Sequence, residues 1–150
     1  MSNRIKLLKE YPAAYKAMSA LQNYLNESSL TPIEKGLIEV RASQINGCAF
    51  CINMHATAAR QNRETEQRLY LLNGWREAPQ IYSEAEQAML KVVEEVTLIA
   101  KGGLSDSTYT LAEKLLGRDK LADVIMATVT INSWNRIVIS SKTPVDTTTG

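Results

Sequence analysis

Apolar residues recur every three or four positions along most of the chain, in segments separated by short groups of turn-forming residues. This spacing places the apolar side chains on one face of a helix, so the pattern predicts helices rather than strands. Asparagine and glycine suit the left-handed residue that ends many helices. The breaks fall at Glu27–Ser29, Asn46–Gly47, Asn73–Gly74, Gly102–Gly103 and Gly117. The predicted helices occupy nearly all of the chain between these breaks.

Two helix starts carry a local signature that does not depend on periodicity. Each places a hydroxyl side chain three residues before a glutamate, in Thr31-Pro32-Ile33-Glu34 and in Ser83-Glu84-Ala85-Glu86. In such a capping box the hydroxyl accepts a hydrogen bond from the glutamate N–H, and the carboxylate accepts one from the capping residue. Pro32 takes the first helical position, where no N–H is needed. Further helices are predicted to begin near Pro12, Cys48, Glu64, Ser105 and Asp119.

The last segment, 121–140, is the stretch in which helix and strand compete. Its many β-branched residues suit a strand. Its length, its lack of turn residues and the spacing of its apolar positions favour a buried helix, and we predict a helix. The chain shows no internal repeat and no linker. We therefore predict one all-α domain over residues 1–150, a helical bundle with its core in about 5–140 and a flexible tail at 143–150.

The charge balance removes several classes of function. Lys and Arg number 17 against 16 Asp and Glu, and a net charge of +1 gives no reason to expect nucleic acid or a membrane surface as partner. No apolar run approaches the roughly 20 residues of a membrane span. The charged N-terminus lacks the apolar region of a secretory signal. We expect a soluble, cytoplasmic protein.

The chemistry of the chain concentrates at its two cysteines and its single histidine. Cys48 and Cys51 are three residues apart and His55 follows four residues later, so on one helix all three lie on the same face. Two sulfurs within one helical turn can form a disulfide after a small local adjustment. Thiols react as thiolates, and two effects favour the thiolate here. The helix N-terminus stabilises a charge on Cys48, whereas His55 can take the proton of Cys51.

Three other interpretations of this cluster fit less well. Cysteine is often only a small buried residue. Two cysteines on the same helical face as the single histidine instead favour a reactive role for the thiols. A structural zinc ion takes four ligands and the cluster supplies three, so an Asp or Glu would have to complete the site. Attachment of haem requires a histidine directly after the second cysteine, where this chain has Ile52. We therefore expect thiol redox chemistry without a metal ion or another cofactor.

The cysteine segment closely resembles the core of the alkylhydroperoxidase D-like proteins, in the carboxymuconolactone decarboxylase superfamily. It reads Arg41-Ala-Ser-Gln-Ile-Asn-Gly-Cys48-Ala-Phe-Cys51-Ile-Asn-Met-His55. Weaker likeness extends over most of residues 30–140, through Glu64–Tyr70, Trp75–Glu77, Glu84–Glu86 and Ile131–Arg136. The resemblance implies an all-α fold, trimers or hexamers, and peroxide reduction by the cysteine pair. It matches Cys51 to the cysteine that attacks the peroxide, Cys48 to the resolving cysteine and His55 to a proton-relay histidine.

The chain departs from that family at two relay positions. The best-studied members carry a glutamate at the position of Gly36 and can carry a second histidine at the position of Phe50. Glu39 lies three residues after Gly36, about 60° round a helix, and is one candidate for the missing relay group. Glu86, on another predicted helix, is the other. For both glutamates a solvated surface position is the competing interpretation. An incomplete relay predicts a slow enzyme.

We therefore expect a cofactor-free thiol peroxidase for small or organic hydroperoxides, reduced by a dithiol or a thioredoxin-like protein. Cys51 is the expected attacking residue, because a positioned base accelerates proton transfer by ~10²–10⁴-fold and exceeds the effect of a helix dipole. Two alternatives stay open. One is a protein disulfide oxidoreductase without peroxidase activity, and the other is a non-catalytic oligomeric protein that senses redox state or binds metal. Decarboxylation needs no cysteine pair and is not expected.

Several large side chains bear on packing and assembly. Trp75 and Trp134 are predicted to pack in the core or between subunits rather than to bind substrate. Asn135 and Arg136 stand in a mostly apolar segment, where a buried arginine requires a carboxylate partner. We expect Arg136 to be structural or to lie at a subunit contact. Because a small all-α chain must cover its aromatic side chains, we expect a homo-oligomer.

Overall fold

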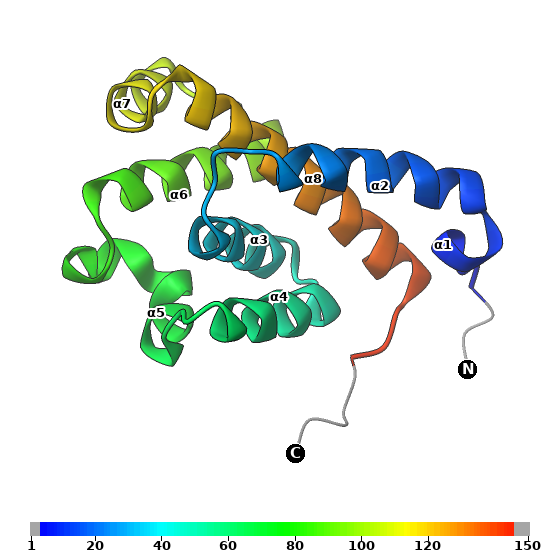
Figure 1. Ribbon diagram of the computed structural model, residues 1–150. Coiled ribbons are helices and arrows are strands. Elements are labelled where there is room, and N and C mark those ends of the chain that lie inside the picture. Colours follow the sequence, from blue (N-terminus) through cyan, green and yellow to red (C-terminus); the bar gives the residue numbers. More distant parts are fainter. Residues whose placement is uncertain (1–3, 146–150) are drawn as a thin grey trace.

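The computed structural model describes residues 4–145, and helices make up most of that range (Figure 1). They are α1 (Leu7–Glu10), α2 (Pro12–Asn26), α3 (Pro32–Asn46), α4 (Ala49–Gln61), α5 (Glu66–Leu71), α6 (Glu84–Thr97), α7 (Asp106–Leu116) and α8 (Arg118–Ser141). Shorter 3₁₀ turns follow α5 at Leu72–Glu77 and Pro79–Ile81, and follow α6 at Ile99–Lys101. Residues 4–145 contain no strand, so the all-α prediction is confirmed. The expected tail lies largely outside the described residues.

Helix α3 lies at the centre of the bundle and packs against α4, α6 and α8 (Figure 1). Its own side chains Leu37, Ile38 and Val40 are almost completely buried. The core continues through Met89, Leu90, Val92 and Val93 of α6 and through Leu121, Val124 and Ile131 of α8. The buried positions on α8 are spaced by helical turns, and this spacing explains why 121–140 is a helix despite its β-branched residues. Burial of that face outweighs the strand propensity of the segment.

Local signals set the ends of the long helices. Thr31 and Glu34 form the predicted capping box at the start of α3, with Pro32 in the first turn. The Glu34 side chain also accepts a hydrogen bond from Lys120 of α8 at 2.8 Å. Gly47 ends α3 in the left-handed conformation, with φ of 70°, which glycine adopts without steric cost. Both predictions for the ends of α3 are therefore confirmed.

Three details of the helix prediction differ from the structure. Helix α6 ends at Thr97 rather than at Gly102–Gly103, because the chain tightens there into a 3₁₀ turn. Helix α5 begins at Glu66, since the Thr65 side chain accepts a hydrogen bond from the Arg68 N–H and caps it. The four-residue helix α1 has no signature in the sequence and was not predicted. Such short helices depend on contacts with the rest of the fold.

A buried carboxylate ties α3 and α6 to the 3₁₀ turn after α5. Glu94 accepts hydrogen bonds from the Trp75 indole at 2.9 Å, from Arg41 at 2.8 Å and from Arg76. Burial alone would raise the pKa of Glu94, but hydrogen bonds from Trp75, Arg76 and Arg41 outweigh it and lower the pKa below its ordinary value. Trp75 is buried, and Trp134 packs partly buried against the core. These tryptophan positions agree with the packing role that we predicted.

Within residues 4–145, no helix combines the length and the apolar character needed to cross a lipid bilayer.

Candidate functional site

The two cysteines lie where the chain turns from α3 into α4. Cys48 is the N-cap of α4, and its sulfur accepts a hydrogen bond from the backbone N–H of Cys51 at 3.3 Å. The Cys48 N–H donates in turn to the Ser43 carbonyl at 3.0 Å. These bonds hold the first turn of α4 against the end of α3. The two sulfurs form a disulfide, with Cα atoms 5.3 Å apart, within the normal range for this bond.

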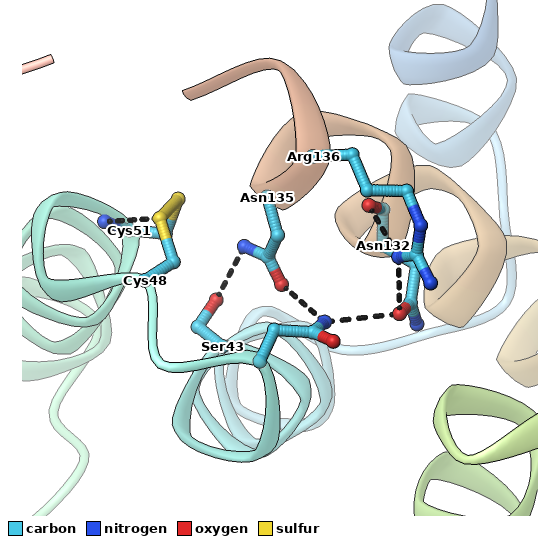
Figure 2. Close-up of a disulfide and its surroundings, with 7 residues drawn as sticks. Ser43, Cys48, Cys51, Asn132, Asn135 and Arg136 are labelled. Carbon is cyan, nitrogen blue, oxygen red and sulfur yellow. Dashed lines mark hydrogen bonds between the residues drawn. A yellow bond between two sulfur atoms is a disulfide. The ribbon is translucent and has the colours of Figure 1, made fainter. Parts of the chain in front are cut away.

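The disulfide is covered on the side that faces α8. Cys48 and Cys51 are each only 1% exposed, and both pack against Phe50 of α4 and Val138 of α8. Figure 2 shows the disulfide beside the end of α8. A thiol from outside must approach along the S–S axis to exchange with a disulfide. Phe50 or Val138 must therefore move before such a thiol can reach either sulfur.

His55 of α4 pairs with Glu39 of α3. The His55 Nδ1 and the Glu39 Oε2 atoms are 2.8 Å apart, and both side chains are largely buried, at 15% and 17% exposed. A carboxylate at Nδ1 fixes the tautomer with the proton on Nδ1 and leaves Nε2 as the base. The pair lines a pocket of about 260 Å³ between α3 and α4. Of the two glutamates considered from the sequence, Glu39 is the one that the fold brings to His55.

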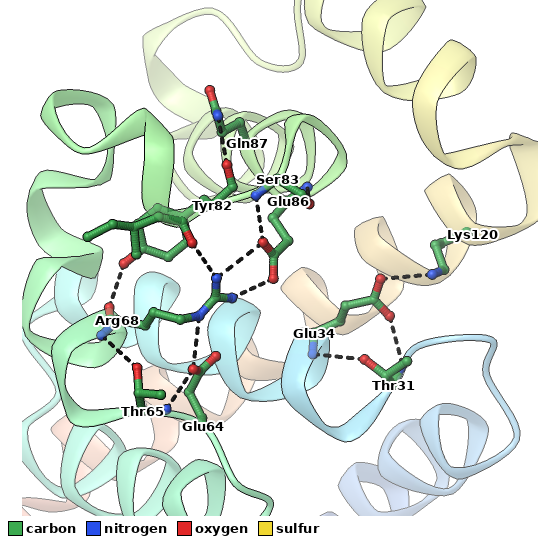
Figure 3. A network of polar contacts seen from close by, with 11 residues as sticks. Thr31, Glu34, Glu64, Thr65, Arg68, Tyr82, Ser83, Glu86, Gln87 and Lys120 are labelled. Carbon is green, nitrogen blue, oxygen red and sulfur yellow. Dashed lines mark hydrogen bonds and ion pairs between the residues drawn. The ribbon is translucent and has the colours of Figure 1, made fainter.

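Glu86 lies in a different polar network, shown in Figure 3. Its carboxylate accepts hydrogen bonds from the Ser83 N–H at 2.8 Å and from Arg68 at 2.5 Å. Arg68 also donates to Glu64 at 2.9 Å. These contacts give Glu86 two structural tasks, capping α6 and holding Arg68, and place it away from the pair formed by His55 and Glu39.

Gly36 lies at a close contact that leaves no room for the glutamate expected at this position from the sequence resemblance. Helices α3 and α4 approach closely here: a Cβ atom on Gly36 would lie 2.9 Å from the Cβ of Ala59. Cβ atoms do not approach so closely, and neither atom belongs to a flexible side chain that could turn away. A side chain at position 36 would therefore push α4 away from α3, whereas Glu39, one turn further along α3, reaches His55 without such a clash.

This contact gives a stability prediction. Gly36→Ala should lower the free energy of unfolding by about 1 kcal/mol, since overpacking costs about 1–3 kcal/mol and the gain in helix propensity returns up to about 1 kcal/mol. Urea denaturation of both proteins measures the difference. Gly74→Ala is the matched control, because nothing lies within 4 Å of a Cβ placed there. Equal or higher stability of Gly36→Ala would contradict the close contact.

A buried amide network beside the disulfide was not predicted. Asn46 of α3 donates to the side-chain oxygens of Asn132 at 3.0 Å and of Asn135 at 2.8 Å, both on α8. Asn135 donates to the Ser43 hydroxyl at 3.0 Å and is fully buried. Figure 2 shows this chain of hydrogen bonds linking α3 to α8 next to the cysteines. The sequence signal was the pair of asparagines three residues apart in an apolar helix.

Arg136 differs from the prediction that a buried arginine there would need a carboxylate. Its side chain is exposed, and it donates to the backbone carbonyl of Asn132 at 2.8 Å and to the Asn132 side-chain oxygen at 2.9 Å. A long side chain can place its charged end in water while its stem covers apolar surface. Arg136 therefore satisfies its charge without a buried partner.

A metal site would need at least three ligand side chains that converge on one point. Across residues 4–145, no three side chains of His, Cys, Asp or Glu converge closely enough to hold a metal ion. The carboxylate near His55 is Glu39, and the two cysteines bind each other. Among the described residues, no Asp or Glu supplies the fourth ligand of a zinc site with the two cysteines and His55.

Comparison with known proteins bears directly on this site. Residues 12–95 match the Carboxymuconolactone decarboxylase family, a range that spans more than half of the chain and includes both cysteines, His55 and Glu39. The chain belongs to the carboxymuconolactone decarboxylase family. The uncharacterized protein YdfG of Bacillus subtilis (strain 168) is 39% identical over 140 residues, which cover 93% of this chain and 95% of that protein.

Solved structures extend the comparison to the whole fold of this family member. A protein of unknown function from Agrobacterium tumefaciens, provisionally assigned to antioxidant defence as AhpD, has a TM-score of 0.91 and 37% identity, covering 97% of this chain and 99% of that chain. An uncharacterized peroxidase-related protein from Silicibacter sp. has a TM-score of 0.77 and 24% identity, covering 88% and 70%. At that identity the likeness concerns the fold alone. This carboxymuconolactone decarboxylase family protein therefore has an AhpD-like fold, as the cysteine segment indicated.

Proposed function

We propose that the protein is a thiol-dependent hydroperoxide reductase that works through its cysteine pair. One observation carries the proposal: a disulfide at the N-terminus of α4, with a histidine–carboxylate pair one helical turn beyond it. The AhpD-like fold and the assignment of a relative to antioxidant defence add support. The oxidised pair corresponds to the state that such an enzyme reaches at the end of peroxide reduction.

The proposed reaction has three steps. The thiolate of Cys51 attacks the terminal oxygen of the hydroperoxide, an S–O bond forms, the O–O bond breaks, and the alkoxide leaves as an alcohol after taking a proton. The sulfur of Cys48 then attacks the sulfenic acid on Cys51, so that an S–S bond forms and water leaves. A dithiol supplies two electrons by thiol–disulfide exchange, restores both thiols and becomes a disulfide itself.

His55 is proposed to act as the base that prepares Cys51. Glu39 holds the Nδ1 side of the imidazole, so Nε2 is available to accept the thiol proton and to return it to the leaving alkoxide. The carboxylate also stabilises the imidazolium that forms when the proton is transferred. Glu39 is thus proposed as a positioning residue that replaces the glutamate absent at Gly36.

The central test measures hydroperoxide consumption and dithiol oxidation together on the purified protein. The proposal expects one hydroperoxide reduced for each dithiol oxidised, and no turnover by a Cys48→Ser/Cys51→Ser double variant. Dithiol oxidation by added disulfide substrates without peroxide loss would instead indicate a disulfide oxidoreductase. Stoichiometric zinc in the purified protein would favour a metal-binding role.

Removing the base should slow the first step strongly near neutral pH. We expect His55→Ala to lower the rate of Cys51 oxidation by ~10²–10⁴-fold and to recover partly in alkali, where the thiolate forms unaided. Glu39→Gln, which keeps a hydrogen-bond acceptor but loses the charge, should have a smaller effect. Stopped-flow oxidation of the reduced protein over a pH series measures both, with exposed Glu27→Gln as control. A pH-independent loss in His55→Ala would argue against the base role.

We also propose that the protein assembles into a homo-oligomer, a trimer or a hexamer. Large aromatic side chains remain exposed on the single chain, with Tyr15 at 53%, Tyr11 at 51% and Tyr70 at 72%. Burial of such residues is typical of subunit interfaces. Light scattering at micromolar concentration should give a mass well above the 16.7 kDa of one chain. A strict monomer would contradict the proposal.

A further inference from the structure

A groove lies between the N-terminal segment and the end of α8. It consists of two adjoining pockets of about 660 and 670 Å³, which share Arg4, Leu7, Ile137 and Ser141 as lining residues. We call it the α1–α8 groove. Each pocket falls in the usual size range for small-molecule sites, about 300–1,000 Å³. The groove is therefore large enough to hold an extended organic molecule.

The groove combines an apolar surface with a rim whose charged side chains are all positive. Its apolar lining residues are Ile5, Leu7, Leu8 and Ile137. Its charged lining residues are Arg4, Lys6, Lys9, Arg136 and Lys142. Among residues 4–145, no Asp or Glu lines either pocket. Because the whole chain has a net charge of only +1, five cations in one groove are a marked local excess of positive charge.

Only part of this positive charge is used inside the protein. The Arg4 guanidinium donates to the carbonyl of Ser140 at 3.0 Å, and Arg136 donates to Asn132. The Arg4 contact lies at the C-terminal end of α8 and complements the negative end of its dipole. The three lysines of the rim are exposed and form neither a salt bridge nor a side-chain hydrogen bond with any residue of 4–145. Their charge is available to a ligand.

We propose that the α1–α8 groove binds a monomeric fatty-acid anion. The alkyl chain would cover Leu7, Leu8 and Ile137, and the carboxylate would lie among the rim cations. An isolated carboxylate is the simplest anion that an apolar chain can carry, and it matches both features of the groove. A second copy of the chain fits less well: contact of the groove with the same groove would oppose five cations with five, and a ring contact would need an acidic surface on the neighbouring copy to match them.

The groove adjoins the cysteine site through α8. Ile137 lines the groove, and the next residue, Val138, covers the disulfide from the neighbouring face of the helix. The proposed ligand site nevertheless does not depend on the proposed function, since a fatty acid can bind there whether or not the cysteines reduce peroxide. Binding is therefore measured directly, on the Cys48→Ser/Cys51→Ser variant as well as on the wild type.

Calorimetric titration with amphiphiles below their critical micelle concentrations tests the proposal. Laurate should bind, and its affinity should exceed that of dodecyltrimethylammonium, which has the same chain and the opposite charge, by about tenfold or more. Across octanoate, decanoate and laurate the affinity should rise by about two- to fourfold for each methylene. Equal affinity for the anionic and the cationic amphiphile, or no binding of laurate, would overturn the proposal.

Charge reversal on the rim provides the matched variants. Lys6→Glu/Lys9→Glu should weaken laurate binding by about tenfold, whereas Lys101→Glu/Lys114→Glu, at exposed lysines outside the groove, should leave it unchanged. Circular dichroism confirms that each variant is folded. Equal effects of the two pairs would overturn the proposal. So would protein that sediments with phosphatidylglycerol vesicles but does not bind laurate, or a groove pair that changes only the mass seen by light scattering.

Discussion

Cys51→Ser is expected to abolish peroxide consumption, because the proposed mechanism has one attacking sulfur and serine cannot replace it. A serine hydroxyl at this position keeps the size and the helix contacts of the cysteine but does not form an anion near neutral pH. The His55 base can assist only a group that lies close to ionising. The loss should therefore appear in the first chemical step and not in substrate binding.

Cys48→Ser is the informative partner of that variant. It keeps the attacking thiol but lacks the resolving one, so each molecule should reduce one hydroperoxide and stop with a sulfenic acid on Cys51. A sulfenic-acid probe followed by peptide mass spectrometry locates the label. Labelling of Cys48 in the Cys51→Ser protein, with Cys51 unlabelled in the Cys48→Ser protein, would reverse the assignment of the two roles.

Glu94→Ala should strongly lower the free energy of unfolding. The Glu94 side chain is 11% exposed and Arg41 is 12% exposed, so the alanine would leave a largely buried guanidinium without its charge partner. Breaking a buried pair from one side costs about 3 kcal/mol or more. Urea denaturation measures the change. Glu95→Ala is the control, because Glu95 accepts only from the neutral groups of Ser105 and Thr108, and its loss should cost about 1 kcal/mol.

The same carboxylate gives the protein a defined response to acid. Its pKa is lowered in the folded state, since hydrogen bonds from Trp75, Arg76 and Arg41 outweigh the opposing effect of burial. The contribution of Glu94 is therefore complete above the ordinary glutamate value of 4.5 and is lost as the pH falls through the lower folded value. Glu94→Gln should flatten this part of the stability curve, and an unchanged acid slope in that variant would contradict the assignment.

The helices were predictable because the signals that end them are local. The capping box of Thr31 and Glu34 and the left-handed Gly47 involve residues close in sequence, and the cysteine pair spans one turn. The long helix α8 was also predictable from its length and spacing. Local sequence signals do not predict a helix end that depends on packing. Helix α6, for example, ends at Thr97, before the two glycines that suggested its end.

The site could be predicted only as far as one helix determines it. Spacing assigned Cys48, Cys51 and His55 to one helical segment, and the structure places Cys48 at the N-cap of α4 with Cys51 and His55 inside the helix. Helix geometry made Glu39 a candidate, but its contact with His55 requires α3 to pack on α4 at a particular rotation. The amide network could not be predicted for the same reason, because Asn46 donates hydrogen bonds to residues 86 and 89 positions further along the chain. Single-helix patterns carry no information about such pairs.

The close contact between Gly36 and Ala59 constrains the order in which substitutions can accumulate during evolution. In a lineage with alanine at position 59, a glutamate gained at position 36 loses stability, because its Cβ would press α3 and α4 apart. A glutamate at position 39 meets no such obstacle and already reaches the histidine. Once Glu39 holds the histidine, a second glutamate at position 36 would add no contact that the site needs, while its steric cost would remain. The two relay geometries are therefore separated by an epistatic barrier, and homologues should carry an acidic residue at position 36 or at position 39 with a matching choice at position 59.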